Sequence, residues 1–284
     1  DVLGSRGLGD VYKRQVMFHL SQPKLNFVKT LYFNFRLLPF HTAIKLPIYI
    51  YGPVKFYWLK GKIEIHYPNI YKGMIKLGRN NEFFNGVDKS AFINIGIGGK
   101  LIFEGPCAIS NNYKIRIAKN ATLTFGSYTF FGSAIKFICT NSIYIGQYTR
   151  CAYESQIVDS NFHFVYNEKT RTTTRRNGPI HIGAFNWIGN RTTINKGAKT
   201  KDYTIICAGS LLNKDFSLSP ENNQMLGGMP AKLITSGLKR IFSTKIENEV
   251  ISYFKKNIEK NNYTFNEDFE DNLDSINNWF KNIM

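Results

Sequence analysis

Residues 182–212 read IGAFNWIGNRTTINKGAKTKDYTIICAGSLL, and a pattern returns at every sixth position. The six positions are Ile182, Ile188, Ile194, Thr200, Ile206 and Leu212, and five of the six are apolar. Neither the 3.6-residue period of an α-helix nor the two-residue period of a flat strand produces a period of six. A hexapeptide period is typical of a parallel β-helix, in which each repeat forms one flat side of a coil. We therefore expect these side chains to point into a coil, with Gly183 and Gly189 at its corners.

The same pattern continues on both sides of this stretch. Leu77 and Ile95, each followed by glycine, are 18 residues apart, which is three hexapeptides and therefore one predicted coil. With small insertions the count continues to about residue 215, and one break falls at residues 159–179. The predicted class is therefore mainly β, with a β-helix domain over residues 75–236.

The two ends of the chain differ from the repeats. Residues 1–15 match nothing that follows, and we expect them to be a non-native leader. Residues 16–74 are predicted to form an N-terminal cap with lead-in strands, and residues 237–284 a helical appendage.

An amphipathic, basic helix is predicted within residues 24–41, ending before Pro39. Its apolar stripe consists of Phe27, Leu31, Phe35 and Leu38. Two roles stay open for this helix: a cap over the first coil, or an interfacial helix on anionic lipid. We favour the cap, because a repeat stack needs a cover over its first coil.

Two helices are predicted near the C-terminus. Thr244 and Glu247 form a capping box that starts the first of them. Its stripe consists of Ile246, Val250, Phe254 and Ile258. A second helix around residues 271–283 places Leu273, Ile276, Phe280 and Ile283 on one face. Both stripes are interpreted as docking surfaces.

Composition limits the partners of the protein. The chain has 284 residues of which 43% are hydrophobic, which is enough for a sizeable core. Its net charge of +17 predicts an anionic partner, such as phosphate groups, an acidic glycan, anionic lipid or nucleic acid. No nucleic-acid recognition motif is visible, so we do not expect nucleic acid to be the partner.

The cysteines and histidines do not predict a metal site. Cys107, Cys139, Cys151 and Cys207 show no metal-binding spacing, and no three histidines form a plausible ligand set. The cysteine pattern predicts a reducing, cytoplasmic compartment, and no signal peptide or membrane span is visible. Peripheral contact with the inner face of an anionic membrane stays open as an alternative.

The break in the repeats is the strongest functional signal in the chain. Residues 159–179 read DSNFHFVYNEKTRTTTRRNGP, a polar and basic loop between Ile157 and Ile180. A loop of this length inside a regular stack is usually functional. Among the five histidines, His163 alone combines a coil edge with this loop, whereas His181 is expected to point out of the coil.

The segments around the loop resemble the hexapeptide-repeat acyltransferases. These segments are IGQYTRCAYESQIVDSNFH (145–163), IHIGAFNWIGNRTTINKG (180–197), CAGSLLNKD (207–215) and GGMPAKLI (227–234). In type they are similar to the maltose and galactoside O-acetyltransferases. The opening KTLYFNFRLLPFHTAIKLPI (29–48) resembles bacterial capsular and lipopolysaccharide acyltransferases. The resemblance covers residues 24 to about 236 and implies a left-handed coil.

The resemblance implies direct transfer of an acetyl group from acetyl-CoA to a sugar hydroxyl of a surface polysaccharide or its precursor. A base must take the hydroxyl proton, and histidine suits that role near neutral pH. His163 matches the catalytic histidine of the family. Asp159 could orient the imidazole, or be a solvated loop carboxylate. Trp187 matches a tryptophan that walls the active site, with a packing aromatic as the alternative.

The resemblance also implies coenzyme contacts and a homotrimer. The implied coenzyme contacts are Gly189, Asn190, Ala208, Asn213, Lys214 and Lys232. Small residues would admit the pantetheine arm, and cations would meet the phosphates. In a trimer with sites between neighbouring coils, the loop would reach across to the neighbour. There Asn161, Arg171, Arg175 and Arg176 would meet an anionic acceptor or a CoA phosphate, with a solvated basic loop as the alternative. Thr200 and Cys207 depart from the family pattern, which leaves the coenzyme contacts less defined.

Two other functions stay open. One is an N-acetyltransferase of an amino sugar or xenobiotic on the same fold. The other is a non-catalytic β-helix trimer that binds or scaffolds glycan, against which His163 and its loop argue.

Overall fold

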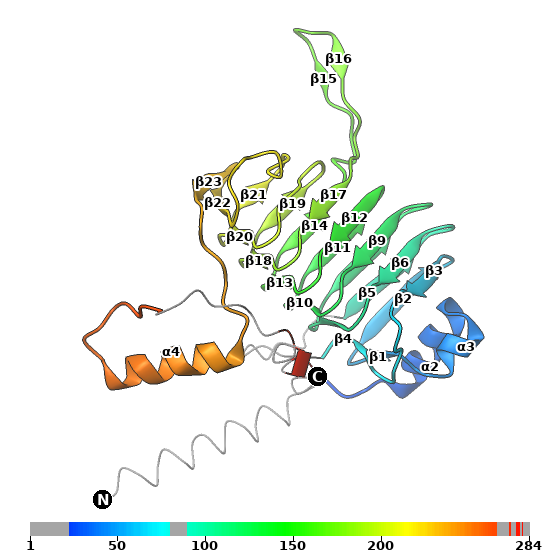
Figure 1. The fold of residues 1–284 in the computed structure, drawn as a ribbon. Coiled ribbons are helices and arrows are strands. Elements are labelled where there is room, and N and C mark those ends of the chain that lie inside the picture. Colours follow the sequence, from blue (N-terminus) through cyan, green and yellow to red (C-terminus); the bar gives the residue numbers. More distant parts are fainter. Residues whose placement is uncertain (1–22, 80–89, 266–272, 274–276, 279, 281–284) are drawn as a thin grey trace, which may run out of the picture.

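A parallel β-helix makes up most of the molecule (Figure 1). The structure is a computed structural model that describes residues 23–79, 90–265, 273, 277, 278 and 280. Within these residues successive strands of the coil lie in three sheets in turn, and strands of neighbouring coils pair in parallel. The mainly β class and the parallel coil predicted from the hexapeptide period are confirmed.

The strands divide among the sheets as follows. Sheet 1 contains β1 (Ile48–Ile50), β4 (Ile75–Leu77), β7 (Cys107–Ile109), β10 (Thr129–Phe131), β13 (Arg150–Cys151), β18 (Trp187–Ile188), β20 (Ile205–Ile206), β22 (Met225–Gly228) and the antiparallel β23 (Ala231–Thr235). Sheet 2 contains β2 (Val54–Leu59), β5 (Ala91–Ile95), β8 (Lys114–Ile117), β11 (Lys136–Cys139), β14 (Gln156–Val158), β19 (Thr193–Asn195) and β21 (Leu211–Leu212). Sheet 3 contains β3 (Lys62–Ile65), β6 (Lys100–Phe103), β9 (Thr122–Phe125), β12 (Ser142–Ile145) and β17 (Ile180–Ile182).

The predicted inward positions form the core of the coil. All six sixth-position residues from Ile182 to Leu212 are at most 2% exposed. Thr200, the polar member, donates a hydrogen bond from Oγ1 to Asn186 Oδ1 at 2.8 Å and accepts one from the Gly183 N–H at 3.1 Å. A hydroxyl is tolerated in this core because both hydrogen bonds satisfy it.

The coil starts earlier than predicted. Strands β1, β2 and β3, which were expected to be lead-in strands, pair in parallel with β4, β5 and β6 and form the first coil. The assignment of Leu77 and Ile95 to one coil position is wrong, because Leu77 pairs with Ile109 in sheet 1 whereas Ile95 pairs with Ile117 in sheet 2. Counting in sixes fails here because the chain between β4 and β5 is longer than one hexapeptide, although the order of the sheets is kept.

Helices α2 (Phe27–Leu37) and α3 (Phe40–Ala43) cap the first coil. The side-chain amide of Asn34 makes two hydrogen bonds to Ile48 of β1. Its Nδ2 donates to the Ile48 carbonyl at 2.7 Å, and its Oδ1 accepts from the Ile48 N–H at 3.2 Å. Thr30 Oγ1 accepts from the Ile50 N–H at 3.0 Å. These bonds satisfy the outer edge of the sheet, which would otherwise be open to pairing with another chain.

The predicted apolar stripe of this helix is only partly correct: Leu38 is buried in the core and Leu31 is partly buried, but the two phenylalanines of the stripe are exposed. Phe27 and Phe35 are 58% and 46% exposed, whereas the buried side chains are Thr30, Phe33, Asn34 and Leu37. The helix docks through these residues because two of them are polar groups that bind the edge of β1.

The C-terminal helix α4 (Thr244–Lys256) starts one residue earlier than the predicted box indicates. Its N-cap is Ser243, whose side chain accepts from the Ile246 N–H. None of the residues of α4 is buried, and Ile258 of the predicted stripe lies beyond the helix. Within the described residues, the stripe is therefore not buried against the coil.

The second predicted helix falls mostly on residues that the structure does not describe. Ile276 and Ile283 lie outside the described residues, as do residues 1–15. Of the other two stripe residues, Leu273 is exposed and Phe280 is 2% exposed, with its ring edge-on to Tyr128 at 5.6 Å. In the described ranges, none of the helices has the length and apolar character needed to cross a bilayer.

Candidate functional site

Residues 159–179 leave the coil between β14 of sheet 2 and β17 of sheet 3 and project from it as a hairpin (Figure 1). Its strands are β15 (Tyr166–Asn167) and β16 (Thr172–Thr173). The base of the hairpin is closed by backbone hydrogen bonds from the Asn161 N–H to the Arg176 carbonyl at 2.8 Å and from the Gly178 N–H to the Asp159 carbonyl at 3.0 Å. The loop predicted from the break in the repeats is thus anchored at the edge between sheets 2 and 3.

His163 follows directly after this closed base. Its N–H donates to the Asn161 carbonyl at 2.7 Å, and its side chain is exposed. Arg171, Arg175 and Arg176 are exposed as well, and the Arg176 guanidinium lies 5.7 Å from the centre of the Phe164 ring. Within one chain, the imidazole and the cationic side chains of the loop therefore face solvent.

Asp159 is neither a solvated carboxylate nor an orienter of the imidazole in the single chain. The residue is fully buried. Its Oδ1 accepts from the Thr140 N–H and Oγ1 at 2.7 and 2.8 Å, and its Oδ2 accepts from the Asn141 N–H at 2.7 Å. Burial first, and the Asp159 carboxylate second, raise the pKa of the Cys139 thiol. Asp159 therefore holds the corner of the preceding coil, from which the loop departs.

Trp187 lies on another side of the coil. It belongs to β18 in sheet 1, its side chain is 44% exposed, and the Arg240 guanidinium lies 5.6 Å from its ring centre. Because His163 follows sheet 2 and Trp187 lies in sheet 1, the single chain does not bring these two predicted site residues together.

The predicted coenzyme residues are divided between the side of the coil that carries Trp187 and the edge that carries the loop. Gly189, Asn190 and Ala208 lie at the corner between sheets 1 and 2. A Cβ added to Gly189 would stand 2.5 Å from the Ala208 nitrogen, so the two corners are stacked closely. Lys232 is exposed on β23 at the end of sheet 1.

Asn213 and Lys214 lie instead at the edge between sheets 2 and 3, which is the edge that carries the loop. Both are exposed. Lys196 lies at the same edge, where its ammonium donates to the Arg175 carbonyl at 2.5 Å. The sequence interpretation did not include Lys196, although its position directly after a strand of sheet 2 could have indicated it.

A second feature that the sequence interpretation missed is an aromatic ladder at the corner between sheets 3 and 1. Its rings stack on successive coils at centroid distances of 5.3, 4.7 and 4.7 Å: Tyr128, Tyr148, Phe185 and Tyr203. Phe242 and Phe280 cover the ladder edge-on. Arg150 is buried beside it, and burial together with Arg240 lowers the pKa of this guanidinium to about 9. Because it attaches the C-terminal segment to the coil, we interpret the ladder as structural.

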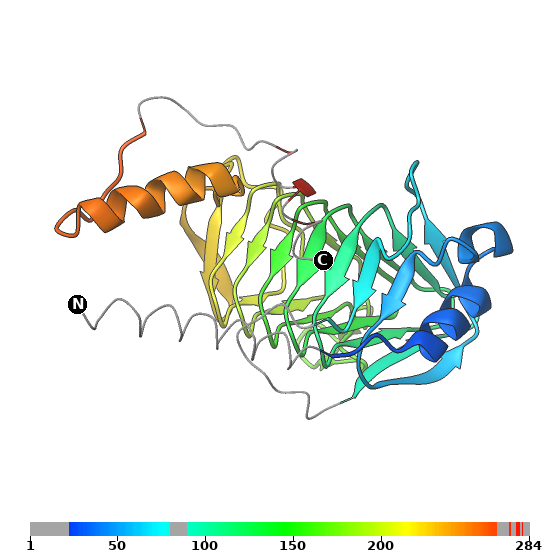
Figure 2. The same ribbon diagram turned by 90° about the horizontal axis from the view of Figure 1, so that it is seen from below.

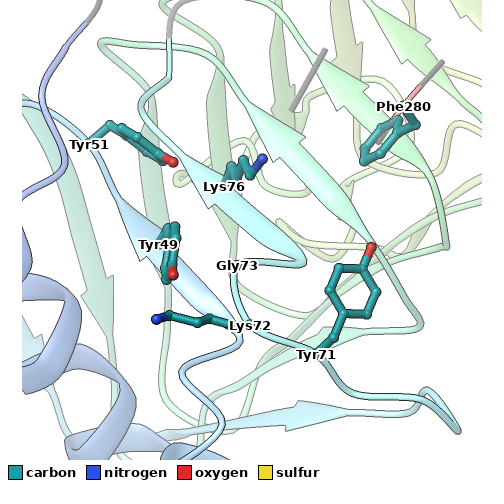
Figure 3. Close-up of a pocket in the computed structure, with 7 residues that line it drawn as sticks. All are labelled: Tyr49, Tyr51, Tyr71, Lys72, Gly73, Lys76 and Phe280. Carbon is teal, nitrogen blue, oxygen red and sulfur yellow. The ribbon is translucent and has the colours of Figure 1, made fainter. Parts of the chain in front are cut away.

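A cavity of about 360 Å³ opens at the N-terminal end of sheet 1 (Figure 3). It is lined by Tyr49, Tyr51 and Tyr71 together with Lys72 and Lys76. Burial raises the pKa of Tyr71. None of the predicted site residues lines this cavity, so it is separate from the loop and from the coenzyme corners. No group of three or more metal-ligating side chains occurs within the part of the chain that the structure describes.

Comparison with known proteins gives structural likenesses only. No protein-family model matches the chain, and no curated protein sequence matches it. The polySia-specific acetyltransferase NeuO is 18% identical, with a TM-score of 0.42, over 74% of this chain and 98% of that one. A maltose O-acetyltransferase from Clostridium difficile 630 is 20% identical, with a TM-score of 0.31, over 64% and 70%.

A third similar structure is AntD, an N-acyltransferase from Bacillus cereus, in complex with dTDP and 3-hydroxybutyryl-CoA. It is 12% identical, with a TM-score of 0.35, over 75% of this chain and 89% of that one. All three are named as acyltransferases. The parallel pairing of strands in three sheets by itself defines the β-helix.

Proposed function

We propose that this protein is an acyltransferase that moves an acetyl group from acetyl-CoA to a sugar hydroxyl of a surface polysaccharide or its precursor, and that it acts as a homotrimer. The observation that carries the proposal is the division of the candidate residues between two edges of one coil. His163 lies with Lys196 and Lys214 at one edge, whereas Trp187, Gly189 and Ala208 lie at another. A site that contains both sets needs two chains, each of which supplies one edge.

In this proposal His163 is the general base. Its imidazole takes the proton of the sugar hydroxyl while the hydroxyl oxygen attacks the thioester carbonyl carbon. The carbon–sulfur bond then breaks, and the sulfur of CoA leaves and gains a proton. The closed base of the hairpin holds the backbone just before His163 in place. There the Asn161 N–H donates to the Arg176 carbonyl, and the Gly178 N–H donates to the Asp159 carbonyl.

The corner residues are suited to hold a coenzyme of this kind. Gly189, Ala208 and Gly209 lie at the corner of sheets 1 and 2, and a Cβ added to Gly209 would meet no atom within 4 Å, so there is open space beside this corner. A pantetheine arm can lie in such a space without a clash. Lys214 and Lys232 are exposed and can reach phosphates, which charge-assisted hydrogen bonds favour.

The test is an acyl-transfer assay with the purified chain. Release of the CoA thiol is followed with acetyl-CoA and a panel of neutral, acidic and amino sugars, and CoA binding is measured by calorimetry. We expect thiol release that depends on a hydroxyl acceptor, and a product ester that hydroxylamine cleaves. An amide product that resists hydroxylamine would favour the N-acetyltransferase instead. Absence of CoA binding at millimolar concentration would exclude both and leave the glycan-binding trimer.

A further inference from the structure

Helix α2 has a second apolar face that is exposed within the part of the chain that the structure describes. On its inward face, Thr30 and Asn34 bind β1, and the Phe33 ring stacks on Phe56 of β2 at a centroid distance of 5.2 Å. On the other side of the helix, Phe27, Val28 and Tyr32 are 58%, 75% and 53% exposed. Residues spaced by three or four positions share a helix face, so these side chains line up with Phe35.

The exposed face continues onto α3. Phe40 and Ile44 are 73% and 56% exposed. The rings of Phe35 and Phe40 lie 6.0 Å apart, which joins the two helices into one surface. We name this surface the cap patch; it consists of Phe27, Val28, Tyr32, Phe35, Phe40 and Ile44. Figure 2 shows that both helices lie at the opposite end of the coil from α4. A contiguous apolar surface of this kind indicates a binding partner.

The charge around the cap patch indicates which partner. Residues 23–63 contain seven lysines and arginines and neither aspartate nor glutamate. Lys24, Arg36 and Lys45 are exposed, and they lie beside or within the two helices. An apolar helix face on a stretch of chain whose charged residues are all cations is typical of helices that lie in the interface of an anionic membrane.

We propose that the cap patch docks the protein on an anionic phospholipid bilayer, with α2 in the plane of the interface. Phe27, Val28 and Phe35 would enter the boundary between headgroups and acyl chains, while Arg36 and Lys45 meet the headgroup phosphates. A second copy of the chain is a poorer partner, because a two-fold contact through this patch would bring the cations of both copies together. The proposal does not depend on the acyltransferase function, because docking needs neither acetyl-CoA nor His163.

Co-sedimentation of the full chain with lipid vesicles tests the proposal. Vesicles of phosphatidylcholine alone are compared with vesicles that contain 30% phosphatidylglycerol. We expect binding to the anionic vesicles to exceed binding to the neutral ones by about tenfold or more, and to weaken as salt is raised.

Two variants and their matched controls separate the apolar and the charged contributions. Phe35→Ser with Phe40→Ser removes apolar area from the patch, and Leu218→Ser, which changes a side chain that is 81% exposed elsewhere, is its control. Lys24→Gln with Arg36→Gln removes charge beside the patch, and Lys245→Gln with Lys255→Gln on α4 is its control. Each patch variant is expected to lower vesicle binding by about tenfold, whereas the controls keep wild-type binding. All substituted side chains are exposed, so melting temperatures should stay unchanged.

Several results would overturn the proposal. They are failure of the wild type to bind anionic vesicles, equal binding to neutral vesicles, or wild-type binding by the patch variants. A patch variant that changes the oligomeric mass in light scattering, without a change in vesicle binding, would assign the patch to a second copy. Because no reaction is measured, failure here leaves the acyl-transfer assay unaffected.

Discussion

Replacement of Asp159 by alanine is expected to destabilise the coil. The carboxylate accepts three hydrogen bonds, two of them from the backbone N–H groups of Thr140 and Asn141. A hydrogen bond to a charged acceptor contributes about 1.5–3 kcal/mol, and each buried donor left without an acceptor costs about 1–3 kcal/mol. Because these donors are only partly buried, we take the lower part of the range and expect a loss of about 2–4 kcal/mol in total.

Thermal unfolding followed by circular dichroism measures this loss. For a chain of this size about 1 kcal/mol corresponds to roughly 3 °C, so the melting temperature of Asp159→Ala should fall by roughly 6–12 °C. Asp159→Asn keeps one acceptor oxygen, so its melting temperature should lie between those of Asp159→Ala and the wild type. His163→Ala is the matched control, because its side chain is exposed and should leave the melting temperature unchanged. If Asp159→Ala has the melting temperature of the wild type but no longer turns over substrate, the carboxylate acts in the reaction and does not stabilise the corner.

The other predictions concern the reaction, the assembly and the stacking of the coils. His163→Ala should lower turnover by about 10²- to 10⁴-fold with little change in CoA affinity or melting temperature, and a folded variant with wild-type turnover would remove His163 from the mechanism. Light scattering at micromolar concentration should report a homotrimer, and a stable monomer would contradict the two-edge site. Gly189→Ala should destabilise the protein by about 1–3 kcal/mol, because the new methyl would stand 2.5 Å from the Ala208 nitrogen. Gly178→Ala is its control, since its nearest atom would be 3.8 Å away, and equal melting temperatures for both variants would refute the stacking argument.

The coil and its interruption could be predicted from the sequence because both depend on local geometry. Whether a side chain points inward or outward is fixed by alternation along a strand, so the sixth-position residues are buried as predicted. The hairpin at residues 159–179 was visible because a polar segment cannot continue an apolar period. The roles of His163, Trp187 and the coenzyme residues stay predictions.

Other features could not be predicted from the sequence, because the role of a polar side chain depends on hydrogen-bond partners that are distant along the chain. The pattern of α2 indicated Phe27 and Phe35 as its docking face, yet Asn34 and Thr30 decide the contact by binding the edge of β1. Asp159 could not be placed from its position before the loop, because its partners belong to the coil before it.

The sequence by itself determined the period, the inward residues and the place where the loop leaves the coil, since each follows from neighbouring residues. Only the tertiary structure decided which sides of the coil come together. The connections between strands differ in length, so Leu77 and Ile95 belong to different sheets although they are three hexapeptides apart. The strand pairing also places His163 after sheet 2 and Trp187 in sheet 1, because the sheet in which a residue lies depends on pairing between coils that are distant in sequence.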